Sequence, residues 1–159
     1  MNDSEKPAVG EVSLTDAQRK TLDALLNLII APSDDGRMPG AAEYDIWGYI
    51  RAAASTLAPA IRDELEQIDA QARAQHGKPF TALDEGGRQT LVEQMRAAEP
   101  GFMSKLANQT VACYYQQDRV LAAIGMEARP PFPIGYQVEA GDLSLLDPVR
   151  GRGRVYREV

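Results

Sequence analysis

The sequence predicts an all-α protein: a small domain of five to six helices, followed by a long extended C-terminal arm that is largely irregular. Apolar residues recur at helical spacing along most of the chain, and no segment alternates apolar and polar residues for more than a few positions. Beyond residue 128 the helical period is lost, although many apolar residues remain. We therefore expect a flexible N-terminus over 1–12, a helical domain over 13–128 and a partner-binding arm over 129–159.

The first predicted helix begins at a capping box, with Ser13 as the capping residue and Asp16 three positions later. The spacing of its apolar residues predicts one buried face, which consists of Leu22, Leu25, Leu26 and Ile29. The helix is expected to end at Ala31, because Pro32 follows. Residues 32–40 combine proline, glycine and aspartate, which is typical of a loop.

Two longer helices are predicted next. The second helix runs over about 41–56, with Tyr44 and Trp47 on a shared face. The third begins near Leu57 and ends before Gly77. Its apolar residues form a single stripe, which consists of Leu57, Ile61, Leu65, Ile68 and Ala72.

Three further helices are predicted over about 84–98, 101–116 and 118–124. Phe80 is expected to pack at the entry to the first of these, and Asp118 is expected to cap the last. Glycine and proline residues separate the helices, so the domain should be a set of helices joined by short connections.

The charge distribution weighs against a nucleic-acid partner. Residues 1–149 carry 13 basic and 22 acidic side chains, a net charge of −9, whereas residues 150–159 carry four arginines and one glutamate, a net charge of +3. Neutralising phosphates requires lysines and arginines clustered over a surface, which an acidic body does not provide. No apolar run is long enough to span a membrane, so direct membrane insertion is not expected.

The N-terminal residues show no basic region followed by an apolar core, and no twin arginine. On this basis we expect a cytoplasmic protein. A periplasmic location would require a signal that has been removed, or export through a partner.

We predict no catalytic, cofactor-binding or metal site in this chain. His76, the single histidine, lies beside a helix break, where a cationic side chain suits the helix dipole. Cys113, the single cysteine, lies within a predicted helix and is interpreted as a small buried hydrophobe. The acidic residues of the third helix are interpreted as its solvated face, and they are Asp63, Glu64, Glu66 and Asp69.

The arm carries the residues that we predict to bind a partner. The arm contains too many apolar residues for a typical disordered tail, and these residues do not recur at helical spacing. We therefore expect its apolar side chains to be buried against another surface. Tyrosine brings apolar area and a polar tip to such interfaces, and arginine can meet acidic or carbonyl groups. The predicted interface residues are Phe132, Ile134, Tyr136, Arg150, Arg152, Arg154 and Tyr156. Tyr114 and Tyr115 fit a core or an interface equally well.

Several short motifs together are distinctive. They are LTDAQ at 14–18, LIIAP at 28–32, PGAAE at 39–43, LANQT at 106–110, YYQ at 114–116, PPFP at 130–133 and GY at 135–136. In this combination the chain resembles the family of gluconate 2-dehydrogenase subunit 3, over about residues 14–136.

The resemblance implies a non-catalytic small subunit that binds and stabilises a large FAD-dependent oxidoreductase of the glucose–methanol–choline type. Such a subunit would assist the folding or cofactor loading of a sugar or alcohol dehydrogenase, and FAD would belong to the partner. Many members of the family carry a twin-arginine signal, which is not visible here. Two alternatives remain open: a stand-alone small enzyme that uses His76 or Cys113, and a regulatory module that binds a protein or an RNA.

Overall fold

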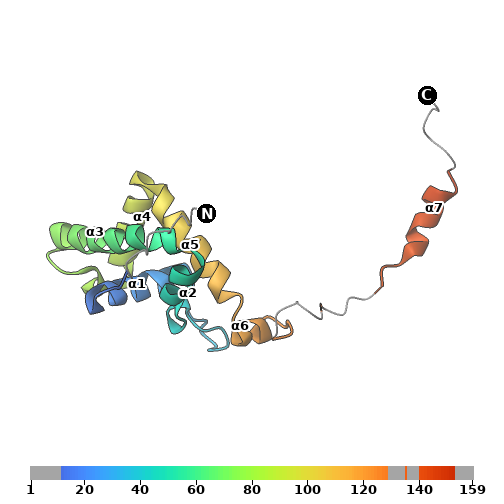
Figure 1. The fold of residues 1–159 in the computed structure, drawn as a ribbon, viewed down its shortest axis with the longest axis horizontal. Coiled ribbons are helices and arrows are strands. Elements are labelled where there is room, and N and C mark those ends of the chain that lie inside the picture. The colour runs from blue at the N-terminus through green and yellow to red at the C-terminus, as the bar shows by residue number, and fades with distance from the viewer. Residues whose placement is uncertain (1–11, 129–134, 136–139, 153–159) are drawn as a thin grey trace, which may run out of the picture. The chain divides into compact units, whose positions relative to one another are not determined.

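The computed structural model describes residues 12–128, 135 and 140–152. All regular structure within these residues is helical, which confirms the predicted all-α class (Figure 1). The chain divides into two compact units, Met1–Ala128 and Arg129–Val159. The flexible N-terminus predicted for 1–12 lies outside the described residues, apart from Val12.

The described part of the first unit, residues 12–128, contains six α-helices and three single turns of 3-10 helix. The α-helices are α1 (Asp16–Ile29), α2 (Ile46–Ala53), α3 (Ala58–His76), α4 (Glu85–Ala98), α5 (Pro100–Tyr114) and α6 (Asp118–Ala123). The 3-10 turns are η1 (Ala41–Glu43), η2 (Ser55–Leu57) and η3 (Phe80–Ala82). Helix α5 contacts α1, α2, α3 and α4, so it is the central helix of the unit.

The core is formed by the apolar stripes that the sequence predicts. Four positions of the predicted stripe on α3 are buried, as are Leu22, Leu25 and Leu26 of α1. Trp47 and Phe80 are also buried, the latter at the entry to α4 as expected. Burial of apolar side chains from every helix of this unit supplies the main stabilising free energy of the fold.

The start of α1 differs from the prediction by two residues. The capping residue is Thr15, whose hydroxyl accepts a hydrogen bond from the backbone of Gln18 at 3.2 Å. The Gln18 side chain in turn accepts from the Thr15 backbone at 2.8 Å, and it donates to Glu66 of α3 at 2.8 Å. The capping box predicted from Ser13 and Asp16 is therefore wrong. The buried Gln18 forms the box with Thr15 instead, and the same side chain also binds Glu66.

The helix predicted over 41–56 is interrupted. After η1 the backbone of Tyr44 is extended, and α2 begins only at Ile46. Asp45 caps α2, since its side chain accepts from the backbone of Gly48 at 3.0 Å. A carboxylate next to its own backbone competes with a continuous helix and favours a new N-terminus.

Two smaller expectations are also wrong. The capping position of α6 is occupied by Gln117, and Asp118 is the first residue of the helix. On α3, Asp69 accepts from the backbone of Phe80 at 3.0 Å and from Arg73 at 2.9 Å. Glu66 likewise accepts a hydrogen bond from Gln18 of α1. Two of the four acidic residues predicted to face solvent, Glu66 and Asp69, therefore join α3 to other elements.

The described part of the second unit contains a short helical segment, η4 (Leu143–Leu146) continued by α7 (Asp147–Arg150). Asp142 caps η4 by accepting from the backbone of Ser144 at 3.0 Å, and Pro148 lies in the first turn of α7. This segment adds an ordered element to the arm, which the sequence predicts to be largely irregular.

Candidate partner interface

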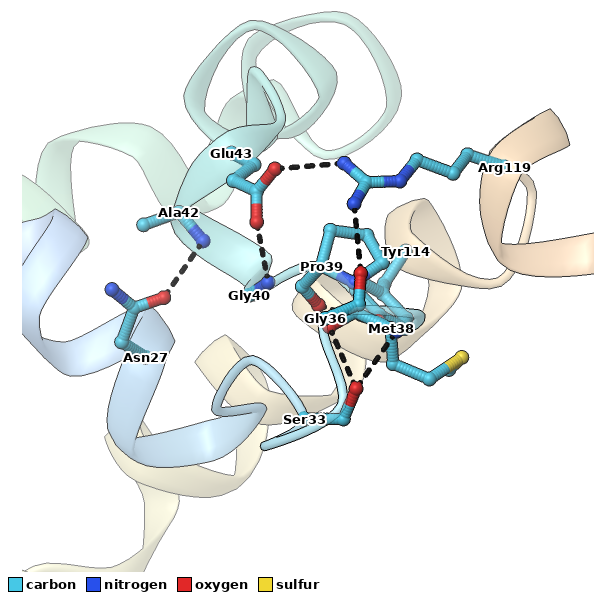
Figure 2. A network of polar contacts seen from close by, with 10 residues as sticks. All are labelled: Asn27, Ser33, Gly36, Met38, Pro39, Gly40, Ala42, Glu43, Tyr114 and Arg119. Atoms are coloured by element: carbon cyan, nitrogen blue, oxygen red, sulfur yellow. Dashed lines mark hydrogen bonds and ion pairs between the residues drawn. The ribbon is translucent and has the colours of Figure 1, made fainter. Parts of the chain in front are cut away.

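The loop over 32–44, which joins α1 to α2, is fixed to the core by a tyrosine of α5. The Tyr114 hydroxyl is buried and donates to the backbone oxygen of Pro39 at 2.7 Å (Figure 2). Asn27 of α1 accepts from the backbone of Ala42 at 3.2 Å, which holds the same loop from the other side. The PGAAE motif is therefore a structural junction between α1, the loop and α5.

Gly40 is required at this junction by close packing. A Cβ atom on Gly40 would lie 2.6 Å from Oδ1 of Asn27 and 3.0 Å from Cδ of Pro32. The Gly40 amide donates to Glu43 at 2.9 Å. The loop thus approaches α1 so closely that any larger residue at this position would force Asn27 or Pro32 to move.

Arg119 joins α6 to the same loop. Its guanidinium donates to a carboxylate oxygen of Glu43 at 3.0 Å and to the backbone oxygen of Gly36 at 3.3 Å (Figure 2). Val120, the next residue, is fully buried. These two neighbouring side chains fix the position of α6 at the end of the helical unit.

Three tyrosines pack edge to face at this end of α5. The rings of Tyr44 and Tyr114 lie 5.8 Å apart, and those of Tyr114 and Tyr115 lie 5.2 Å apart. Tyr114 belongs to the core, whereas Tyr115 is 46% exposed. Burial raises the pKa of Tyr44, whose hydroxyl has no hydrogen-bond partner among the described residues.

The large apolar side chains that are exposed in the described part of the first unit all lie between residues 111 and 126. They are Val111, Tyr115, Ile124 and Met126, each more than two fifths exposed. We call these four residues the α5–α6 apolar surface. The run 106–117 contains no charged residue, although a quarter of the chain is charged. Depletion of charge with enrichment of tyrosine is typical of the central part of protein interfaces.

The helical segment of the second unit also exposes its apolar residues. They are Leu143, Leu145, Leu146 and Val149, and the most exposed is Leu145 at 75%. Of the predicted interface residues, Arg150 and Arg152 are exposed, and Arg150 pairs with Asp147 at 3.0 Å within its own helix. The other predicted interface residues lie outside the described residues, and they are Phe132, Ile134, Tyr136, Arg154 and Tyr156.

An open groove of about 650 Å³ lies between α1, α4 and α5. Leu28, Val92 and Met103 contribute apolar side chains to its lining, while Glu93 and Arg96 contribute charged ones. The two charges have opposite sign and lie one helical turn apart at 4.0 Å, so they offset each other. The lining of the groove therefore combines apolar and charged side chains, and it has no net charge that would favour a charged ligand.

The two residues considered for catalysis lie in different surroundings. Cys113 is buried, and burial raises the pKa of its thiol, while the Gln117 amide lies 3.6 Å from the sulfur and opposes this shift. Cys113 is therefore a small buried side chain of the core, as expected from the sequence. His76 is exposed in the last turn of α3, next to Gly77 in the left-handed conformation. Within the described ranges, no three potential metal-ligating side chains form a group.

A family model confirms the resemblance noted in the sequence. The model for gluconate 2-dehydrogenase subunit 3 matches residues 16–127, which is most of the helical unit. The chain belongs to this family. Membership makes it a subunit of a dehydrogenase with several subunits. No curated protein and no solved structure shows a significant match to this family member.

Sequence reasoning missed most of the exposed apolar residues. Tyr115 belongs to one of the family motifs. Apart from being apolar, Val111, Ile124 and Met126 show no sequence feature that would mark them as exposed interface residues. The lack of charge over 106–117 was the one pattern that could have drawn attention to Val111.

Among the described residues, no helix has both the length and the apolar content needed to cross a membrane.

Proposed function

We propose that this chain is a non-catalytic accessory subunit that binds and stabilises a large FAD-dependent oxidoreductase of the glucose–methanol–choline type. The family match carries this proposal, because it covers the helical unit and names a dehydrogenase subunit. The FAD and the chemistry belong to the large subunit. The small subunit assists its folding or cofactor loading by contact.

The second unit supports a role in contact. Its helical segment over 143–150 presents four large apolar side chains to solvent, which is costly unless a partner covers them. The Asp147–Arg150 pair lies on the same short segment and gives it a polar side. An amphipathic helix of this kind suits an apolar groove on another protein.

The buried core supports a separable helical unit. Every buried apolar residue in the described part of the chain lies at or before Val120, so the described residues of the first unit form a core of their own. Burial of Cys113 with a raised pKa weighs against its use as a nucleophile. These observations favour the accessory subunit over the stand-alone enzyme.

The test is co-expression with a candidate large subunit, a flavin oxidoreductase of the glucose–methanol–choline type. Tagged full-length chain should co-purify with the large subunit, and flavin absorbance should follow the complex. A chain that ends at Ala128 should keep its helical circular dichroism and lose the large subunit. Equal recovery of the large subunit by the shortened chain would show that the arm does not bind it.

A further inference from the structure

The proposed function leaves open whether the helical unit touches the partner or only carries the arm. We infer that the α5–α6 apolar surface is a second docking site for the same flavin subunit. Its four residues, Val111, Tyr115, Ile124 and Met126, are the large apolar side chains that the described part of this unit leaves exposed. This inference rests on the proposed function and adds a site within residues 12–128.

The α5 part of the surface forms one stripe along the helix. Ser104, Asn108, Val111 and Tyr115 are all exposed and lie at i, i+4, i+7 and i+11. None of them is charged. The stripe therefore combines two large apolar side chains with two small polar ones, a composition that suits a desolvated protein interface and provides no cation to neutralise a phosphate.

Tyr115 is held in place before any partner arrives. Its ring packs edge to face on Tyr114 at 5.2 Å, and the Tyr114 hydroxyl is bonded to Pro39. An ordered aromatic side chain loses little conformational entropy on binding, which is why rigid tyrosines often contribute strongly to affinity. The core thus positions Tyr115 as an anchor.

The α6 part of the surface is fixed in the same way. Arg119 and Val120 attach α6 to the loop and the core, and the chain then turns at Gly125, where φ is +78°. The backbone amide of Met126 closes this turn by donating to Leu121 at 2.9 Å. Ile124 and Met126 are therefore held on either side of a defined C-terminal turn.

The short stretch of chain between Met126 and the arm indicates which protein covers the α5–α6 apolar surface. Phe132, the first predicted anchor of the arm, lies six positions after Met126, and six extended residues span at most about 20 Å. A partner that binds the arm near Phe132 must therefore lie within about 20 Å of Met126. The large flavin subunit is large enough to cover both places, so it is the protein that this tether brings to the α5–α6 apolar surface.

The experiment uses the full-length chain co-expressed with the large subunit and compares Tyr115→Asp, Val111→Asp and Tyr115→Phe with the wild type. The matched control is Ala74→Asp, which places the same charge on the exposed side of α3. Each aspartate on the surface should weaken binding by about tenfold or more, because a charge would be desolvated at the contact. Tyr115→Phe and the control should bind as the wild type does. Helical circular dichroism verifies that each variant is folded.

The outcomes separate the two claims. If the wild type binds and both aspartate variants bind equally well, this inference is wrong and the proposed function stands. If the wild type does not bind the large subunit, the proposed function fails, and this inference fails with it. If the isolated chain forms dimers that Tyr115→Asp dissociates, while binding to the large subunit is unchanged, the surface serves a second copy and the inference is overturned.

Discussion

The hydroxyl of Tyr114 donates a buried hydrogen bond to the backbone oxygen of Pro39, across 75 positions of sequence. This single contact joins the central helix α5 to the loop that follows α1. It also explains why two motifs that are distant in the sequence, PGAAE and YYQ, belong to one structural unit. Both motifs take part in the packing and hydrogen bonding that organise the fold.

Removing this hydrogen bond should destabilise the helical unit. Tyr114→Phe leaves the buried oxygen of Pro39 without its partner, and we expect the free energy of unfolding to fall by about 1–3 kcal/mol. Urea denaturation followed by circular dichroism measures the difference. Tyr115→Phe is the matched control, because the Tyr115 side chain is half exposed and should change stability little. Equal effects of the two substitutions would contradict the role of the Tyr114 hydroxyl.

Gly40→Ala should be destabilising by about 1–3 kcal/mol, because the new methyl group would collide with Asn27 and Pro32. Gly86→Ala is the control at a glycine whose Cβ position has no neighbour within 4 Å. That substitution lies in the first turn of α4 and should raise stability by up to about 1 kcal/mol. Thermal unfolding of both variants should therefore shift in opposite directions, and a shift in the same direction would argue against the close approach.

The contact between Arg119 and Glu43 should contribute little to stability, although it fixes α6. Both side chains are about half exposed, and exposed pairs typically contribute about 0–1 kcal/mol. A double-mutant cycle with Arg119→Ala and Glu43→Gln measures the coupling. We expect a coupling below about 1 kcal/mol that decreases as salt is added. A larger coupling that salt leaves unchanged would indicate a role for the pair that its exposure does not predict.

Cys113 should resist thiol reagents in the folded protein. Burial raises the pKa of the Cys113 thiol above the ordinary value of 9.0. The thiol therefore stays protonated in the folded chain at a pH where it is already ionised in the unfolded chain. The free energy of unfolding should therefore decrease as the pH rises above that ordinary value. Alkylation should be slow in buffer and fast in urea, and Cys113→Ser should remove the thiol's share of this pH dependence. Rapid labelling of the folded chain at neutral pH would contradict the buried position.

Local patterns in the sequence were sufficient to predict most of the helices of the first unit. The spacing of apolar residues correctly predicted the face of α3 that is buried, since a helical period depends only on neighbours along the chain. Helix ends were less accurate: Thr15 rather than Ser13 caps α1, and Asp45 caps a new helix inside the segment predicted as continuous. A cap depends on which side chain reaches the backbone, and several neighbouring residues could do so.

The candidate interface was harder to predict for a different reason. The sequence by itself determined an all-α chain with a distinct C-terminal arm and with motifs that lead to its family. Only the tertiary structure separated Tyr114, which is buried, from Tyr115, which is exposed, and showed that Val111 lies beside the latter at the surface. Periodicity states which residues share a face of a helix, but what covers that face depends on segments far away in the sequence, such as the loop that Tyr114 holds.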